Sequence, residues 1–97
     1  MAEFKNKRVI LKFGGEKCKP CKRVEPTVRE LEKKYPKVLV VSLDVDKNSK
    51  IADQYDIEKI PSFVALYAGK QKGDTYTGTD VDKIEDLFKD LSKKHAK

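Results

Sequence analysis

Residues 8–22 read RVILKFGGEKCKPCK. This stretch decides the fold because it predicts a buried strand followed by a helix that begins at a pair of cysteines. Residues 9–13 form a short apolar run of the kind found in a central strand that is covered on both faces. Cys18 and Cys21 follow where a helical pattern begins, and the chain contains no other cysteine. This placement makes a reversible dithiol/disulfide the leading hypothesis.

The two cysteines occupy different positions at the start of the expected helix. The first turn of a helix presents unpaired N–H groups and the positive end of its dipole, which together stabilise a thiolate. Cys18 is therefore the candidate nucleophile. Cys21 lies one turn later, close enough to attack a mixed disulfide formed at Cys18 and release the reduced substrate, so it is the candidate resolving thiol.

The first half of the chain alternates between strand and helix patterns. Apolar residues recur at helical spacing over residues 20–35, and Pro26 inside this segment predicts a kink. Residues 38–45 are rich in β-branched side chains and predict a second buried strand, followed by a short helix over residues 49–55. A βαβ crossover makes the first two strands parallel.

The second half predicts an antiparallel hairpin and a closing helix. Strands over residues 62–67 and 74–77 are joined by a turn that contains Gly69. A helix over residues 80–94 has Thr79 and Asp82 as its expected capping box. The order is β-α-β-α-β-β-α, which predicts an α/β fold with a central mixed four-stranded sheet flanked by helices.

Length and composition predict one small globular domain over residues 1–97, because the 97-residue chain is 38% hydrophobic and 39% charged. No apolar stretch approaches the roughly 20 residues that span a bilayer, and residues 1–8 lack the apolar segment of a secretory signal. We therefore expect a soluble, cytoplasmic protein. The net charge of +6 is spread along the chain among 16 acidic residues, which favours a solvated lysine-rich surface over nucleic-acid binding.

Cys-x-x-Cys pairs also occur in zinc sites, and burial of two core thiols is a further alternative. Zinc takes four ligands, whereas this chain offers two thiols and a single histidine, His95, near its end. Lysines at positions 17, 19 and 22 make an unfavourable setting for buried thiols. We expect no metal ion within one chain, and a metal shared between two chains stays open.

Ile60 and Pro61 precede the strand expected over residues 62–67. A proline at the first position of a strand can adopt the cis isomer and turn the chain sharply. On local sequence alone an ordinary trans proline is the more frequent outcome.

Several segments together carry a family resemblance: VILKF at 9–13, CKPCK at 18–22, Pro26 in the helix, LDVD at 43–46, IPS at 60–62 and Gly78 before the last helix. In this order they cover nearly all of residues 8–91, and they resemble the thioredoxin family. The resemblance implies a thioredoxin-like fold.

The resemblance also implies a dithiol–disulfide oxidoreductase that reduces protein disulfides without a bound cofactor. It implies that Cys18 is the nucleophile, Cys21 the resolving cysteine and Pro61 a cis-proline packed against the dithiol, with Pro20 supporting the site. Ile60 then offers backbone hydrogen bonds to an extended substrate segment. The expected partners are disulfide-containing proteins and a thioredoxin reductase, and the expected state is a monomer that binds neither nucleic acid nor membrane.

Some positions depart from the family pattern. Lys17 stands where the family has a tryptophan, and Gly14 replaces an aromatic residue, so we expect substrate docking at Lys17 to depend less on aromatic contact. Only residues 1–7 precede the first strand, so the family's additional amino-terminal strand and helix are expected to be largely missing. A short edge strand over residues 3–5 is the most that this segment predicts.

Lys12 and Lys19 are the departures that bear on chemistry. Lys12 occupies the strand position where thioredoxins commonly carry a buried aspartate beneath the dithiol. It can act as a desolvated lysine that accepts a proton, as a permanent cation that stabilises a thiolate, or as a buried stem whose ammonium reaches the surface. Lys19 stands where the family usually has glycine. Both charges favour the thiolate, so we expect a less reducing disulfide than in a similar site without them.

The preferred interpretation is a protein-disulfide reductase. Two alternatives stay open. The expected potential favours an oxidase or isomerase role within the same class of enzyme. The missing tryptophan, the shortened amino terminus and Lys12 motivate a binding or assembly module with little turnover, whereas the retained cysteines, Ile60–Pro61 and the helix proline argue against it.

Overall fold

The computed structural model describes residues 8–93, which form strands and helices in an α/β order. The expected short edge strand over residues 3–5 lies outside the described residues. The elements, in chain order, are β1 (Arg8–Gly14), α1 (Lys19–Lys34), β2 (Val38–Asp44), α2 (Ser49–Gln54), β3 (Ser62–Tyr67), β4 (Lys70–Gln71), β5 (Tyr76–Thr77) and α3 (Val81–Ser92).

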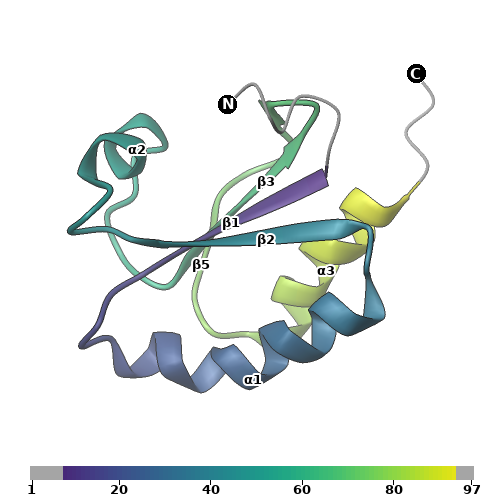
Figure 1. The fold of residues 1–97 in the computed structure, drawn as a ribbon, viewed down its shortest axis with the longest axis horizontal. Coiled ribbons are helices and arrows are strands. Elements are labelled where there is room, and N and C mark those ends of the chain that lie inside the picture. Colours follow the sequence, from purple (N-terminus) through teal and green to yellow (C-terminus); the bar gives the residue numbers. More distant parts are fainter. Residues whose placement is uncertain (1–7, 94–97) are drawn as a thin grey trace.

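The sheet is mixed, as the sequence predicts, and its strand order is β2-β1-β3-β4 with β5 also paired to β3. Strand β1 runs parallel to β2 and antiparallel to β3. Because β1 occupies one edge of β3 along its length, β4 and β5 share the other edge (Figure 1). The central position predicted for β1 is confirmed.

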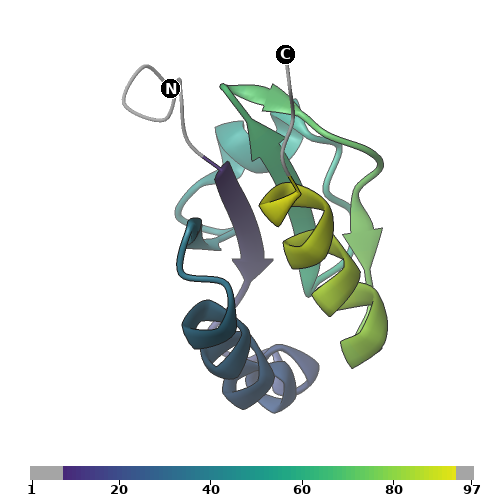
Figure 2. The same cartoon turned by 90° about the vertical axis from the view of Figure 1, so that its right-hand side faces the viewer.

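Helices cover both faces of this sheet (Figures 1 and 2). Helices α1 and α3 pack on one face, where Ile10 of β1 contacts their apolar stripes, and Phe88 of α3 is fully buried there. Ala52 of α2 packs on the opposite face against Val9, Leu11 and other residues of β1 and β3. This alternation of side chains from one strand into two cores is the period-two pattern of a buried strand. No helix within residues 8–93 is long and apolar enough to cross a membrane.

The strand predicted over residues 74–77 is shorter in the structure and is preceded by a second short strand. Residues 70–71 pair with β3 directly after a turn in which Ala68 and Gly69 both have positive φ. The chain then leaves the edge of β3 and returns only at Tyr76–Thr77. The fourth sheet position therefore holds two short strands.

Two further expectations are wrong. Strand β2 is not buried on both faces, because it lies at the edge of the described sheet: Val38 is buried, whereas Leu39 is 44% exposed. The cap of α3 is Asp80, not Thr79, since the Asp80 carboxylate accepts hydrogen bonds from the backbone N–H groups of Asp82 and Lys83.

Helix α1 is amphipathic and buries Val24, Val28 and Leu31 against the sheet. Pro20 lies in its first turn, where the missing N–H of proline costs no hydrogen bond. The helix continues through Pro26 to Lys34, and the kink expected at Pro26 stays a prediction.

A small polar cluster joins the end of α1 to α3. The Glu85 carboxylate accepts hydrogen bonds from the Lys34 ammonium at 2.7 Å and the Tyr35 hydroxyl at 2.8 Å. These two hydrogen bonds hold the pKa of Glu85 below its ordinary value. Burial, followed by the neighbouring Glu85, raises the pKa of Tyr35, so its hydroxyl remains a donor.

Replacement of Glu85 by glutamine is expected to lower thermal stability at neutral pH and to have little effect in acid. The folded-state pKa of Glu85 is lowered, so its contribution is present above the ordinary carboxyl pKa and is lost as the pH falls through the lowered value. Thermal melts of the wild type, Glu85→Gln and the exposed control Glu32→Gln at both pH values check this. A Glu85→Gln deficit that persists undiminished in acid would contradict it.

Candidate active site

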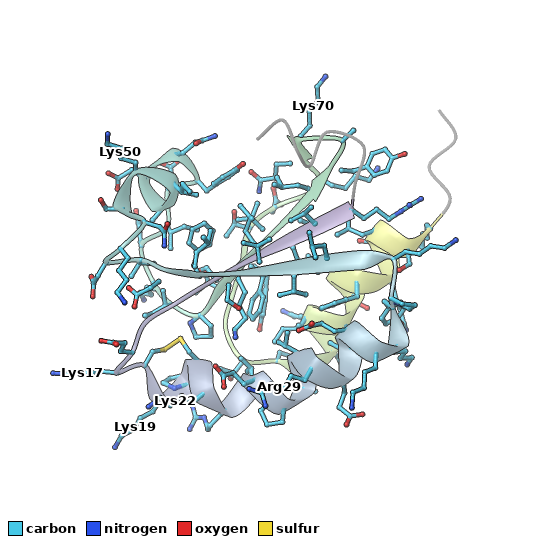
Figure 3. The ribbon with its side chains drawn as sticks, viewed as in Figure 1. Lys17, Lys19, Lys22, Arg29, Lys50 and Lys70 are labelled. Carbon is cyan, nitrogen blue, oxygen red and sulfur yellow. A yellow bond between two sulfur atoms is a disulfide. The ribbon has the colours of Figure 1, made fainter. Side chains whose placement is uncertain are left out.

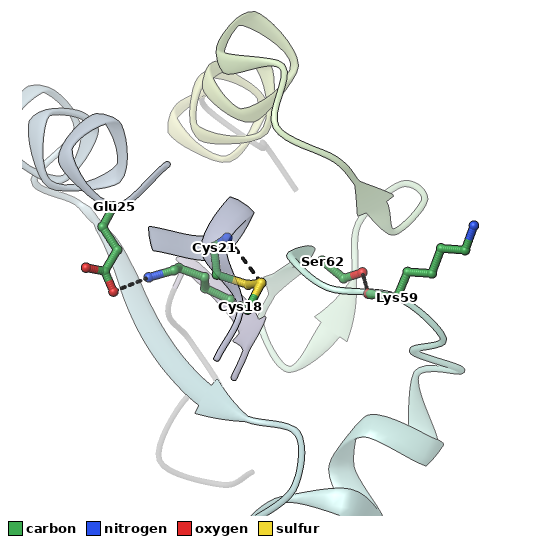
Figure 4. The surroundings of a disulfide bond; sticks show 6 residues. Cys18, Cys21, Glu25, Lys59 and Ser62 are labelled. Carbon is green, nitrogen blue, oxygen red and sulfur yellow. Dashed lines mark hydrogen bonds and ion pairs between the residues drawn. A yellow bond between two sulfur atoms is a disulfide. The ribbon is translucent and has the colours of Figure 1, made fainter. Parts of the chain in front are cut away.

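The two cysteines form a disulfide at the amino-terminal end of α1, directly after the loop that follows β1. The Cα atoms of Cys18 and Cys21 are 5.2 Å apart. Cys18 is the N-cap of the helix, and its Sγ accepts a hydrogen bond from the backbone N–H of Cys21 at 3.1 Å (Figure 4). The same donor and the helix dipole are in place to stabilise a thiolate at Cys18 after reduction.

The two sulfurs differ in their access to solvent. Cys18 is half-buried, whereas Cys21 is only 4% exposed and faces the body of the domain. A bulky disulfide substrate can therefore approach Cys18 and cannot approach Cys21.

A groove of about 520 Å³ lies beside Cys18 and brings several predicted residues together. Lys17, Cys18, Pro20 and Ile60 all line it, together with residues of the loop after β2. The Ile60–Pro61 peptide bond is cis, as the family resemblance implies. Pro61 itself is buried and does not line the groove.

Hydrogen bonds to residues 77–78 and within the segment itself hold the chain around Pro61. The Pro61 carbonyl accepts a hydrogen bond from the Gly78 N–H at 3.1 Å. The buried hydroxyl of Ser62 lies 2.6 Å from the Thr77 hydroxyl and donates to the Lys59 carbonyl, the bond drawn in Figure 4. Gly78, which the sequence marked only as part of the resemblance, thus holds the backbone at Pro61 in place.

Lys12 lies on the other side of the disulfide, on the α1 face of β1. It is 8% exposed, and its Nζ forms an ion pair with Glu25 Oε2 at 3.7 Å (Figure 4). Both side chains line a second cavity of about 560 Å³ together with Cys21. The sequence interpretation missed Glu25, although its position four residues after Cys21 on one helix places the two on the same helix face.

The remaining predicted cations lie at the surface. Lys17, Lys19 and Lys22 are exposed and lie around the disulfide (Figure 3). None of the three forms an ion pair within residues 8–93. Their charge adds to the positive end of the α1 dipole, which carries no acidic residue in its first turn.

No group of three or more histidine, cysteine or acidic side chains that could hold a metal ion occurs within the described residues. The groups gathered around the disulfide are instead lysine ammonium groups, carboxylates and backbone amides. They suit acid–base and thiol chemistry.

A disulfide at the start of a helix, beside a groove lined by the residue that precedes a cis-proline, is an arrangement suited to thiol–disulfide exchange. Residues 2–92 match the family model described as Thioredoxin. The chain belongs to the thioredoxin family, a family of protein-disulfide oxidoreductases.

Similar proteins agree with this assignment. Thioredoxin H5 of Oryza sativa is 32% identical over 87 residues, and Thioredoxin-1 of Drosophila melanogaster is 33% identical over 89 residues. The chain spans 64% of the rice protein, less than two thirds of its length, and 82% of the fly protein. These alignments cover 90% and 91% of the chain. The crystal structure of reduced Schistosoma mansoni thioredoxin pre-protein has a TM-score of 0.83 and 36% identity, covering 92% of this chain and 83% of that one.

Gly78→Ala is expected to destabilise the protein more than Gly73→Ala. Both glycines have positive φ, but a Cβ at Gly78 would lie 2.6 Å from the Tyr76 hydroxyl, whereas one at Gly73 meets nothing within 4 Å. We expect the overpacking at Gly78 to lower the free energy of unfolding by about 1–3 kcal/mol more than the Gly73 substitution does, as measured by urea unfolding. An equal decrease in the free energy of unfolding in the two variants would contradict this, because it would show that the Tyr76 side chain moves aside without an energetic cost.

Proposed function

We propose that this protein reduces disulfide bonds in other proteins through the reversible Cys18–Cys21 disulfide. The observation that supports this most directly is the position of Cys18. Its sulfur is the more accessible of the pair, caps a helix and lines a groove large enough for a peptide segment. A sulfur in this environment combines substrate access with stabilisation of its thiolate.

The reaction begins when the Cys18 thiolate attacks one sulfur of a substrate disulfide. A bond forms between Cys18 Sγ and that sulfur, and the other substrate sulfur leaves as a thiolate, which takes a proton from water. The Cys21 thiolate then attacks Cys18 Sγ and expels the second substrate sulfur. The substrate gains two electrons, and the Cys18–Cys21 disulfide is left behind.

The groove beside Cys18 is the proposed substrate site. Ile60 lines this groove, where its backbone can pair with an extended segment of the substrate. Lys17 lines the same groove and supplies a flexible, charged contact at the position where the family has an aromatic one.

A thioredoxin reductase is the proposed electron donor, since the oxidised pair needs two electrons to start a new cycle. The chain is proposed to act as a monomer in the cytoplasm, without nucleic acid or membrane. An apolar side chain left exposed at the edge, such as Leu39, is ordinary for a monomeric surface.

Substitution of either cysteine separates the two proposed steps. Cys18→Ser is expected to abolish reduction of insulin disulfides, because it removes the attacking sulfur. Cys21→Ser is expected to stop turnover but to accumulate a mixed disulfide with the substrate, because the resolving thiol is gone. Non-reducing electrophoresis and mass spectrometry of the trapped complex measure this.

Two outcomes would count against the assignment. Insulin reduction that survives in Cys18→Ser would refute the proposed nucleophile. A reduced wild-type protein that captures one partner tightly, without being oxidised by protein disulfides, would favour the binding-module alternative.

Lys19 is proposed to make the disulfide more oxidising, because a cation beside Cys18 stabilises the reduced, thiolate-bearing form. A charge at an exposed helix terminus contributes about 0.3–1 kcal/mol. Lys19→Gln is therefore expected to lower the reduction potential by about 5–20 mV. Lys50→Gln, on the distant helix α2, is the matched control (Figure 3).

Equilibration with a glutathione redox buffer measures these potentials. A Lys19→Gln potential equal to that of Lys50→Gln, or less negative than the wild type, would contradict the assigned effect. The wild-type value also separates a reductase from an oxidase or isomerase, since the latter require a less negative potential.

A further inference from the structure

Cys21, the proposed resolving cysteine, lines a different cavity from the groove beside Cys18. This second cavity, of about 560 Å³, lies between β1, α1 and the end of β2. Gly14 and Gly15 form part of its wall, and a Cβ at Gly14 would lie 3.4 Å from Cys21 Sγ. Any larger side chain at Gly14 would therefore cover this sulfur, whereas glycine leaves it open to the cavity.

The charged groups that face the cavity come from every element around it. They are Lys12 on β1, Glu16 in the following loop, Lys22 and Glu25 on α1, and Asp44 on β2. The Asp44 carboxylate already accepts the backbone N–H of Asp46 at 2.8 Å in the turn after β2.

Glu25 is the carboxylate that the buried lysine holds in place. Its Oε2 lies 3.7 Å from Lys12 Nζ, and its side chain is 45% exposed, so one end meets a buried cation and the other meets water. Cys21 precedes it by one helical turn on the same face of α1. The ion pair thus draws one carboxylate toward the wall that contains Cys21.

We propose that Glu25, positioned by Lys12, accepts the proton of the Cys21 thiol through water in this cavity. The proposal rests on the proposed function, in which Cys21 resolves the mixed disulfide. The proton leaves Cys21 Sγ, passes through water and ends on the Glu25 carboxylate. The resulting Cys21 thiolate attacks Cys18 Sγ, the bond from Cys18 to the substrate sulfur breaks, and the substrate leaves as a thiolate.

Charge balance explains why a buried lysine favours this route. Before the transfer the cavity holds the Lys12 ammonium, the Glu25 carboxylate and a neutral thiol. Afterwards it holds the same ammonium, a neutral carboxylic acid and a thiolate. The negative charge moves from Glu25 to Cys21, so the cavity gains no net charge. This favours the route, because an unpaired charge in a poorly solvated place is costly.

The test uses the reduced full chain in excess over 5,5′-dithiobis(2-nitrobenzoate), because each of the two steps releases one coloured thiolate. The first release reports attack by Cys18, and the second reports resolution by Cys21. Glu25→Gln is expected to leave the first phase unchanged and to slow the second at least ~10-fold at mildly acidic pH. The difference is expected to close as the pH rises and hydroxide takes over, and Glu25→Asp is expected to restore part of the rate.

Glu30→Gln, on the exposed side of the same helix, is the control. The double variant Lys12→Met/Glu25→Gln separates loss of the proton acceptor from the harm of leaving Lys12 unpaired. We expect it to remain as slow in the second phase as Glu25→Gln. A double variant that recovers the wild-type rate would overturn the proposal.

Two other results would also overturn it: a second phase in Glu25→Gln equal to that in Glu30→Gln at every pH, or equal slowing of both phases. Failure of the proposed function appears elsewhere, as a missing first phase in the wild type. The two failures are therefore distinguishable in one experiment.

Discussion

The hydrogen bonding of β1 along both of its edges is the constraint on which the site depends. Its register pairs Phe13 with Ser62 of β3 and Gly14 with Asp44 of β2. The end of β1 is thereby fixed beside the start of β3 and the end of β2. The loop to α1, the cis-proline segment and the loop after β2 must then converge, and the disulfide lies where they meet.

Patterns that are local in sequence were sufficient for most of this architecture. The apolar run of β1, the helical spacing of α1 and the β-branched content of β2 predicted these elements, because each pattern is imposed by the element's own geometry. The exposure of β2 could not be predicted from its local pattern. Its composition suits a central strand, but exposure depends on what lies beside it, and β2 is an edge strand in the described sheet.

The division of the fourth sheet position into β4 and β5 was similarly hidden. Turn residues such as Gly69 and Gly73 mark where the chain changes direction, but they do not reveal which residues pair with β3 afterwards. The prediction of Thr79 as the cap of α3 was wrong for a simpler reason. Thr79 and Asp80 are neighbours with equal capping chemistry, and only the backbone geometry decides between them.

For the site, the sequence predicted roles for the cysteines, Pro61 and Ile60, because those roles follow from the residues' own chemistry or from the family pattern. It identified Lys12 as unusual without finding its partner. Ion pairs between a strand and a packed helix depend on tertiary contact, so the sequence could not predict that Glu25 pairs with Lys12. The spacing of four residues between Cys21 and Glu25 on one helix could have shown that they share a helix face.

The disulfide separates two environments, and this separation gives its sulfurs different requirements. In the proposed reaction Cys18 exchanges with a large substrate, so it needs an accessible groove and a backbone donor that stabilises its thiolate. Cys21 would react only within the protein, so it can be buried, but a buried thiol needs somewhere to send its proton. Gly14 meets that need, because a Cβ at this position would lie 3.4 Å from Cys21 Sγ and its absence leaves the sulfur open to the cavity. Glu25 stays 45% exposed, so one end of the Lys12–Glu25 pair meets solvent, which lowers the cost of keeping a lysine beneath the disulfide.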